Sequence, residues 1–304
     1  MVQKASSIRT HAVRTHAGRT QPGRGARGVV GNVTRGTTNP NRMRRVDRWI
    51  TGPHARRILS LPADPLAVDL GYGASPITAL ELFTRLRSLR PDMRLTGIEI
   101  EPARVAAAKP LEVPGLDFRL GGFELPVPGR PALVRAFNVL RQYEEADVAG
   151  IWGLVCSRLA PGGLFVEGTC DEIGRRAAWV ALDADGPLTL SLAARFGAFG
   201  LPSDLAERLP KALIHRNVPG ERIHGFLGAL DAAWLAAAPL APFGVRQRWV
   251  AMCRGVKDAG WPVHHGPGRW RLGELTVGWD AVAPGPPDRP APRVMEAGAA
   301  AAGR

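Results

Sequence analysis

Two glycines that follow an aspartate are the most chemically specific feature of the sequence. They lie in AVDLGYGASPITALEL (67–82), where an apolar run ends at Asp69, Gly71 and Gly73 follow, and a helical pattern begins. A glycine turn between a strand and a helix presents backbone amides to a ligand, which can be a nucleoside triphosphate, a dinucleotide or another molecule. The turn has no Gly-Lys-Ser/Thr sequence, which excludes a nucleoside triphosphate loop.

A dinucleotide turn is disfavoured for two reasons. The third glycine of GxGxxG would fall at position 76, where the chain has Pro76. An aspartate two residues before Gly71 would also face a pyrophosphate and repel it. An acid at this position favours a ligand that is positively charged at one end, such as S-adenosylmethionine with its ammonium and sulfonium groups.

The stretch VDLGYG resembles the DxGxG motif of the class I S-adenosylmethionine-dependent methyltransferases. The resemblance implies that Asp69, Gly71, Tyr72 and Gly73 hold the amino-acid part of the cofactor. LTGIEIEPARVAAA is similar to the second strand of that family, where an acid accepts hydrogen bonds from the ribose hydroxyls. Glu99 fits this role, and Glu101 is the rival position.

Three further stretches are similar to the same family and occur in the same order. FRLGGFELP resembles the motif that frames the adenine, with Gly122 in place of the common acid, which implies backbone contacts from Gly122 and Phe123. ALVRAFNVLRQY resembles the fourth strand and its loop, and LAPGGLFVEG the helix–PGG–strand element. The resemblance covers about residues 66–170 and implies an enzyme that transfers a methyl group by in-line displacement, with S-adenosylmethionine as cofactor and no metal.

Asn138 and Glu167 are the candidate catalytic residues, because they lie near the ends of the expected fourth and fifth strands. Further polar candidates there are Arg135, Arg141, Tyr143 and Asp171. Asn138 is followed by Val-Leu and not by Pro-Pro-aromatic, which disfavours DNA adenine and release-factor-type substrates. A small molecule and RNA remain open as acceptors. The dispersed histidines predict no metal site.

Strand and helix patterns alternate through the middle of the chain and predict parallel βαβ units. Together with the resemblance, they predict an α/β fold: a doubly wound, mostly parallel, seven-stranded Rossmann-like methyltransferase sheet with a C-terminal helical insertion. The expected strands are 66–71, 94–100, 116–121, 131–137 and 164–170, followed by a hairpin over 177–194 around Asp185-Gly186 and a strand-like end over 270–282. The expected helices of the first half are 76–89, 102–110 and 144–160.

Composition divides the chain into a disordered basic arm (1–40), a methyltransferase domain (41–283) and a disordered Pro/Ala-rich tail (284–304). The domain consists of a cofactor half (66–170) and a helical cover (about 203–261) that we expect along one edge of the sheet. Residues 1–45 contribute +10 to a net charge of +13, so the basic character belongs to the arm. The arm either contacts a polyanion or is a solvated extension.

Two further basic regions have open roles. Residues 36–45 (GTTNPNRMRR) could form a lid over the site or touch an anionic substrate. The helical cover carries Lys211, His215, Arg216, Arg246 and Arg248. These charges suit either a small anionic metabolite or a nucleic acid, or they are simply solvated.

The remaining composition is that of a globular protein, with 45% hydrophobic residues and no apolar run of membrane length. Three cysteines without pairing spacing favour a reducing compartment, so we expect a cytoplasmic protein. One alternative function is a catalytically silent methyltransferase-like fold that binds nucleic acid or acts as a scaffold. A nucleotide-sugar or NAD-dependent enzyme is a third hypothesis, weakened by Asp69 and Pro76.

Overall fold

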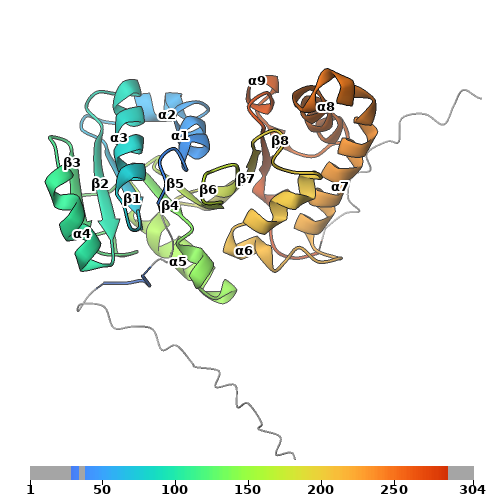
Figure 1. The fold of residues 1–304 in the computed structure, drawn as a ribbon. Coiled ribbons are helices and arrows are strands. Elements are labelled where there is room, and N and C mark those ends of the chain that lie inside the picture. Colours follow the sequence, from blue (N-terminus) through green and yellow to red (C-terminus); the bar gives the residue numbers. More distant parts are fainter. Residues whose placement is uncertain (1–28, 34–37, 287–304) are drawn as a thin grey trace, which may run out of the picture.

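The computed structural model describes residues 29–33 and 38–286. These residues form a nine-stranded sheet with the order β3-β2-β1-β4-β5-β6-β7-β9-β8, flanked by helices (Figure 1). The strands are β1 (Leu66–Leu70), β2 (Arg94–Glu99), β3 (Leu116–Leu120), β4 (Leu133–Phe137), β5 (Leu164–Cys170), β6 (Arg176–Asp183), β7 (Gly186–Ala194), β8 (Val263–His264) and β9 (Glu274–Gly278).

Strands β3, β2, β1, β4 and β5 are parallel, as the alternation of strands and helices predicted. β1 lies between β2 and β4, and its register aligns Asp69 with Gly97 on one side and Arg135 on the other. All five residues of β1 and of β4 are buried, because helices cover both faces of this part of the sheet. The chain adds β2 and β3 on one side of β1 and then returns to add β4 and β5 on the other side, which makes the carboxyl end of β1 the topological switch point.

The other half of the sheet differs from the expected fold. Strands β6, β7, β9 and β8 are antiparallel, so a seven-stranded, mostly parallel sheet is wrong, and the sheet is mixed. The cause lies in residues 171–175, which join β5 to β6 by a short turn. A parallel partner would require a crossover of a dozen or more residues, so this turn forces β6 to run backwards along β5. The hairpin at Asp185-Gly186 is present as predicted.

Helices flank the sheet on both faces and at its β7–β9 end. They are α1 (Arg44–Thr51), α2 (Ala55–Leu59), α3 (Ile77–Leu89), α4 (Pro102–Ala108), α5 (Glu145–Arg158), α6 (Lys211–Ile214), α7 (Arg222–Ala236), α8 (Val245–Asp258) and α9 (Pro267–Trp270). Short 3₁₀ helices cover Lys109–Leu111, Leu140–Gln142, Pro202–Arg208, Ala238–Phe243 and Trp279–Ala281. No helix in the described ranges is long and apolar enough to cross a membrane.

The buried apolar residues form two cores, one on each face of the sheet. One core joins α1 and α3 to one face through residues such as Trp49, Leu82 and Trp179. The other joins α5, α7 and α8 to the opposite face and contains Trp152, Phe226 and other large side chains. The helices predicted for 203–261 therefore pack against β7 and β9, away from β1 (Figure 1).

The predicted arm and tail fall mostly outside the described residues. Residues 1–28, 34–37 and 287–304 are not described, so the disorder expected for 1–40 and 284–304 stays a prediction. Residues 29–33 and 38–40 are described, and they contact the domain at the carboxyl ends of the parallel strands.

Candidate cofactor site

The glycine turn after β1 has the backbone that its sequence requires. Gly71 and Gly73 have φ angles of +69° and +84°, a conformation that side chains with a Cβ disfavour. The Gly71 amide donates to the Ile98 carbonyl of β2 at 2.8 Å. The turn is therefore fixed to the end of the neighbouring strand.

Glu99 lies at the end of β2 and is fully buried. Its Oε2 accepts a hydrogen bond from the Gly73 amide at 2.8 Å, and its Oε1 accepts one from the Ile100 amide at 3.1 Å. Arg104 of α4 approaches the same carboxylate at 3.5 Å. Oε1 also accepts the Glu101 amide at 3.3 Å, so its lone pairs are taken, whereas Oε2 has one donor and can accept another. Glu101 precedes α4, which begins at Pro102 as expected.

Asp69 is held by a partner that the sequence did not reveal. Arg135 of β4 donates from Nε to Oδ1 at 2.9 Å and from Nη2 to Oδ2 at 2.7 Å. The same guanidinium binds Asp47 of α1, and both Asp47 and Arg135 are fully buried. Burial opposes the charge of Arg135, but the two carboxylates outweigh it and raise its pKa. The charge of Asp69 is therefore compensated inside the protein, so it no longer argues for a cationic ligand, and its contact with a cofactor stays a prediction.

The ends of β1, β2 and β3 meet in one crevice at the topological switch point. Of the predicted cofactor residues, Gly71, Glu99, Gly122 and Phe123 line it together. Sequence reasoning missed the apolar walls Leu70, Ile100 and Val139, which end or follow strands and carry no pattern of their own. Tyr143, a candidate for the substrate side, also lines this crevice.

Residues 29–33 fill the crevice almost completely. The Phe123 amide donates to the Val30 carbonyl at 2.9 Å, and the Val30 amide donates to Glu124 Oε2 at 2.7 Å. The Asn32 amide donates to the Tyr143 hydroxyl at 2.5 Å. A Cβ at Gly122 would lie 1.9 Å from the Val30 oxygen, so this approach requires glycine. The free volume that remains is about 20 Å³, roughly one water molecule.

Residues 38–45 cross the carboxyl ends of the strands next to this crevice. The Thr38 hydroxyl donates to the Tyr72 carbonyl at 3.0 Å, and Asn39 Nδ2 donates to the Glu172 carbonyl at 2.9 Å. Arg42 Nε donates to the Asp171 carbonyl at 3.0 Å. The segment predicted as a possible lid therefore lies over the ends of β1 and β5.

The remaining predicted cofactor residues do not line the crevice. The ring of Tyr72 packs edge-on against Phe118 with 5.4 Å between centroids, and its hydroxyl donates to the Arg104 carbonyl at 3.3 Å. Gly73 reaches the site through Glu99. For Tyr72, Gly73 and Asp69, a direct cofactor contact stays a prediction.

The two candidate catalytic residues occupy different environments. Asn138 has a left-handed φ of +60° directly after β4, and its Oδ1 accepts the Cys170 amide of β5 at 3.0 Å. Glu167 of β5 is fully buried, and neither carboxylate oxygen has a hydrogen-bond partner among the described residues. Burial raises the pKa of Glu167 to about 8, and the nearby Trp152 indole offsets this only in part. Glu167 is therefore protonated at neutral pH, and its role as a base stays a prediction.

The other polar candidates are engaged locally. Arg141 donates to the Glu207 carbonyl at 3.0 Å, and Asp171 accepts the Arg175 amide at 2.8 Å within the β5–β6 turn. Arg135 is buried and does not face a substrate. Within the described ranges, no group of three or more His, Cys, Asp or Glu is placed to hold a metal ion.

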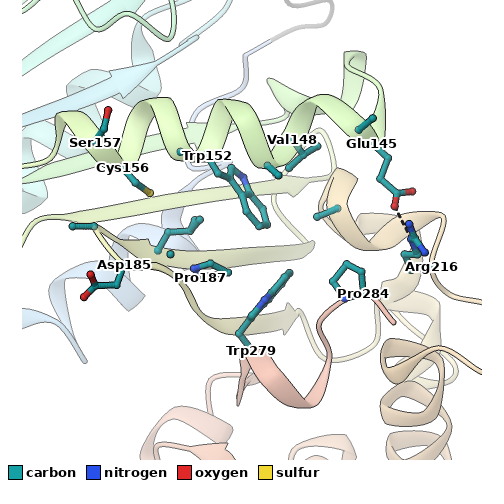
Figure 2. Close-up of a pocket in the computed structure, with 17 residues that line it drawn as sticks. Glu145, Val148, Trp152, Cys156, Ser157, Asp185, Pro187, Arg216, Trp279 and Pro284 are labelled. Carbon is teal, nitrogen blue, oxygen red and sulfur yellow. Dashed lines mark hydrogen bonds and ion pairs between the residues drawn. The ribbon is translucent and has the colours of Figure 1, made fainter. Parts of the chain in front are cut away.

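A larger cavity of about 820 Å³ lies on the α5 side, between α5, the β6–β7 hairpin and the chain after β9 (Figure 2). Trp152 and Trp279 line it and pack edge-to-face with centroids 5.6 Å apart, and the Glu145–Arg216 ion pair of 2.6 Å lies at one end (Figure 2). None of the predicted cofactor or catalytic residues lines it. It is therefore not the candidate cofactor site.

The comparisons with known proteins gave matches among solved structures alone. No protein-family model and no curated protein matches the sequence. Solved structures do match it, and several of them are methyltransferases. Human N-acetylserotonin methyltransferase in complex with SAM is 26% identical, with 44% of this chain and 39% of that chain covered and a TM-score of 0.29. The mitomycin 7-O-methyltransferase MmcR is 18% identical, with 40% and 36% covered and a TM-score of 0.29.

A putative sarcosine dimethylglycine methyltransferase from Galdieria sulphuraria is 14% identical, with 46% of this chain and 55% of that chain covered and a TM-score of 0.34. The chain thus spans only about a third to a half of the length of these structures. TM-scores this low are too weak to assign a function to the chain.

Proposed function

We propose that this chain binds S-adenosylmethionine in the crevice at the end of β1 and transfers its methyl group to a small-molecule or RNA acceptor. The observation that supports this best is the convergence of Gly71, Glu99, Gly122 and Phe123 on one crevice. Open α/β sheets bind ligands at the carboxyl ends of strands where the strand order reverses, and this crevice lies at that point.

The residues present fit the cofactor that the DxGxG resemblance implies. Oε2 of the buried Glu99 carboxylate would accept a hydrogen bond from a ribose hydroxyl, since it has one donor and can take another. The Phe123 amide already donates to a carbonyl inside the crevice, so it can serve an acceptor atom of the adenine. The glycine turn, fixed by its bonds to β2, would hold the amino-acid end.

The chemistry places few demands on the protein. The bound cofactor supplies a methyl group on a sulfonium, which is already an activated leaving group. The contribution of this chain is therefore to orient the reactants and exclude water. Asp47, Arg135 and Asp69 hold α1, β1 and β4 in a fixed geometry beneath the glycine turn, which is a positioning role.

Cofactor binding requires residues 29–33 to leave the crevice. Ligand sites of this kind usually have volumes of roughly 300–1,000 Å³, whereas about 20 Å³ is free here. The bonds to Phe123, Glu124 and Tyr143 must therefore be exchanged for bonds to the ligand.

Calorimetric titration with S-adenosylmethionine and, separately, NAD tests the proposal. Glu99→Gln should weaken binding of S-adenosylmethionine by about tenfold or more, because a charged acceptor is lost inside a buried site. Glu101→Gln is the matched control, since Glu101 lies two residues away at the start of α4, and it should bind like the unchanged protein. Equal losses in both variants, or tighter binding of NAD, would overturn the proposal.

The filled crevice also favours the alternative of a catalytically silent fold that binds nucleic acid or acts as a scaffold. Removal of residues 1–33 separates the two. Appearance of S-adenosylmethionine binding in the shortened chain supports the enzyme, and its continued absence supports the silent fold.

A further inference from the structure

A second cavity at the carboxyl edge of the strands is lined mainly by arginine. It has a volume of about 570 Å³ and lies between α1, the β5–β6 turn, the end of β7, the start of α8 and the chain before β9. The arginines that line it are Arg44, Arg45, Arg48, Arg175, Arg195, Arg246 and Arg271. The only acid among the lining residues is Glu274.

The single acid cannot neutralise this cluster. Glu274 is buried and already forms an ion pair with Arg269, which is not a lining residue. Arg45 donates to the carbonyls of Gly174 at 3.2 Å and Leu272 at 3.0 Å, so it keeps its full charge. Arg246 lies over the Phe196 ring, 5.6 Å from the centroid.

None of the seven lining guanidinium groups forms an ion pair with a described residue; burial raises the pKa of Glu274, and the charges of Arg45 and Arg48 are near enough to oppose this together with Arg269. No hydrogen bond or ion pair to a described residue is made by the side chains of Arg44, Arg48, Arg175, Arg195 and Arg271. They come from separate elements, α1, the β5–β6 turn, the end of β7 and the chain before β9, which the fold brings together. A solvated helix face would not converge on one concavity in this way.

The charges act on one another inside the cavity. Burial lowers the pKa of Arg45, the charges of Glu274 and Asp171 oppose this, and the charges of Arg195 and Arg44 add to the lowering. A concave surface of one sign also concentrates counter-ions. An anion in the cavity would remove this repulsion, so the site gains free energy from binding negative charge.

We propose that this cavity binds a small organic molecule that carries two or more phosphate groups. Guanidinium groups bind phosphate through paired hydrogen bonds, and a lining with arginines from several elements suits more than one phosphate. The volume lies within the range of roughly 300–1,000 Å³ typical of small-molecule sites. Phe196, Ile173 and Leu272 provide apolar surface for the organic part.

The site is independent of the proposed cofactor crevice. Residues 41–45 separate the two: Arg42 contacts the end of β5 on one side, while Arg44 and Arg45 line the cavity on the other. Binding here requires neither methyl transfer nor removal of residues 29–33. Ligand binding in this cavity can therefore be tested independently of the proposed function.

Calorimetric titration of the full-length chain with ATP, inorganic pyrophosphate and a 12-nucleotide poly(U) RNA tests the proposal. The double variant Arg175→Gln/Arg195→Gln removes two charges from the cavity. The control Arg56→Gln/Arg254→Gln removes two charges from exposed arginines outside the cavity. All four side chains are exposed, so both variants should unfold at the same temperature as the unchanged chain.

We expect ATP and pyrophosphate to bind the unchanged chain and the control within about twofold of each other, and the cavity variant about tenfold more weakly. Equal weakening in both variants would mean non-specific attraction and would overturn the proposal. Absence of ATP and pyrophosphate binding would do the same. The proposal would also be overturned if the RNA bound more tightly than ATP and lost affinity in the cavity variant, because the site would then be a nucleic-acid contact.

Discussion

Because the buried carboxyl of Glu167 has no hydrogen-bond partner among the described residues, we expect Glu167→Gln to change how the free energy of unfolding depends on pH. In the folded protein burial raises the pKa of this carboxyl from 4.5 to about 8. Each pH unit between these values corresponds to about 1.4 kcal/mol, so deprotonation in the folded state costs about 5 kcal/mol. The folded form binds the proton more tightly than the unfolded form, and its stability falls as the pH rises from 4.5 through 8.

Glutamine has the shape of protonated glutamate and does not ionise. At pH 5 we expect Glu167→Gln to have the same free energy of unfolding as the unchanged protein, or about 1 kcal/mol less, because its amide also lacks partners. At pH 9 it should be more stable than the unchanged protein by about 3–5 kcal/mol.

Urea denaturation at pH 5, 7 and 9, followed by far-ultraviolet circular dichroism, measures this difference. Glu172→Gln is the control, because Glu172 is exposed in the β5–β6 turn and should follow the unchanged protein at every pH. Subtracting the two curves cancels the pH dependence of all other groups. A difference that stays constant from pH 5 to 9, or a Glu167→Gln protein that loses several kcal/mol at pH 9, would refute the reasoning.

Three further perturbations test other parts of the structure. Arg135→Met leaves the buried Asp69 without its counterion and Asp47 with Arg85 alone, so we expect a loss of about 3–5 kcal/mol in urea denaturation at pH 7; a loss below about 1 kcal/mol would contradict the buried network. Gly97→Ala places a Cβ 2.5 Å from the Phe118 ring, and we expect it to lower stability by about 1–3 kcal/mol, measured by thermal melting. Deletion of residues 1–33 should tighten S-adenosylmethionine binding relative to deletion of residues 1–28, which keeps the segment in the crevice; equal calorimetric affinities would show that the segment does not compete.

The parallel half of the fold was predictable from local patterns. Strands β1 to β5 are short apolar runs, mostly separated by helical periodicity, and the positive φ angles of Gly71 and Gly73 are ones that glycine permits. The direction of β6 was not predicted, because the turn sequence DEIGR between β5 and β6 contains no strong hairpin signal. Strand β8 has two residues, which is too short to produce any pattern.

The sequence predicted the site residues that lie at or directly after the ends of the parallel strands. It did not predict contacts between segments that are far apart in the chain. Gly71, Glu99, Gly122 and Phe123 meet because each follows a parallel strand at the same edge. The pairing of Asp69 with Arg135 could not be inferred, since 66 residues separate them and a buried arginine looks like a substrate contact in sequence. The position of residues 29–33 was equally hidden, because VVGNV has neither strand length nor helical periodicity.

The exchange of residues 29–33 for a ligand affects the rate of cofactor binding as well as its affinity. If the cofactor enters only after this segment has left, the observed association rate rises with cofactor concentration at first and then levels off at the rate of opening. Mixing experiments on a millisecond scale would show this plateau in the full chain and a linear dependence after deletion of residues 1–33. The release of these five residues would then limit the rate of cofactor binding.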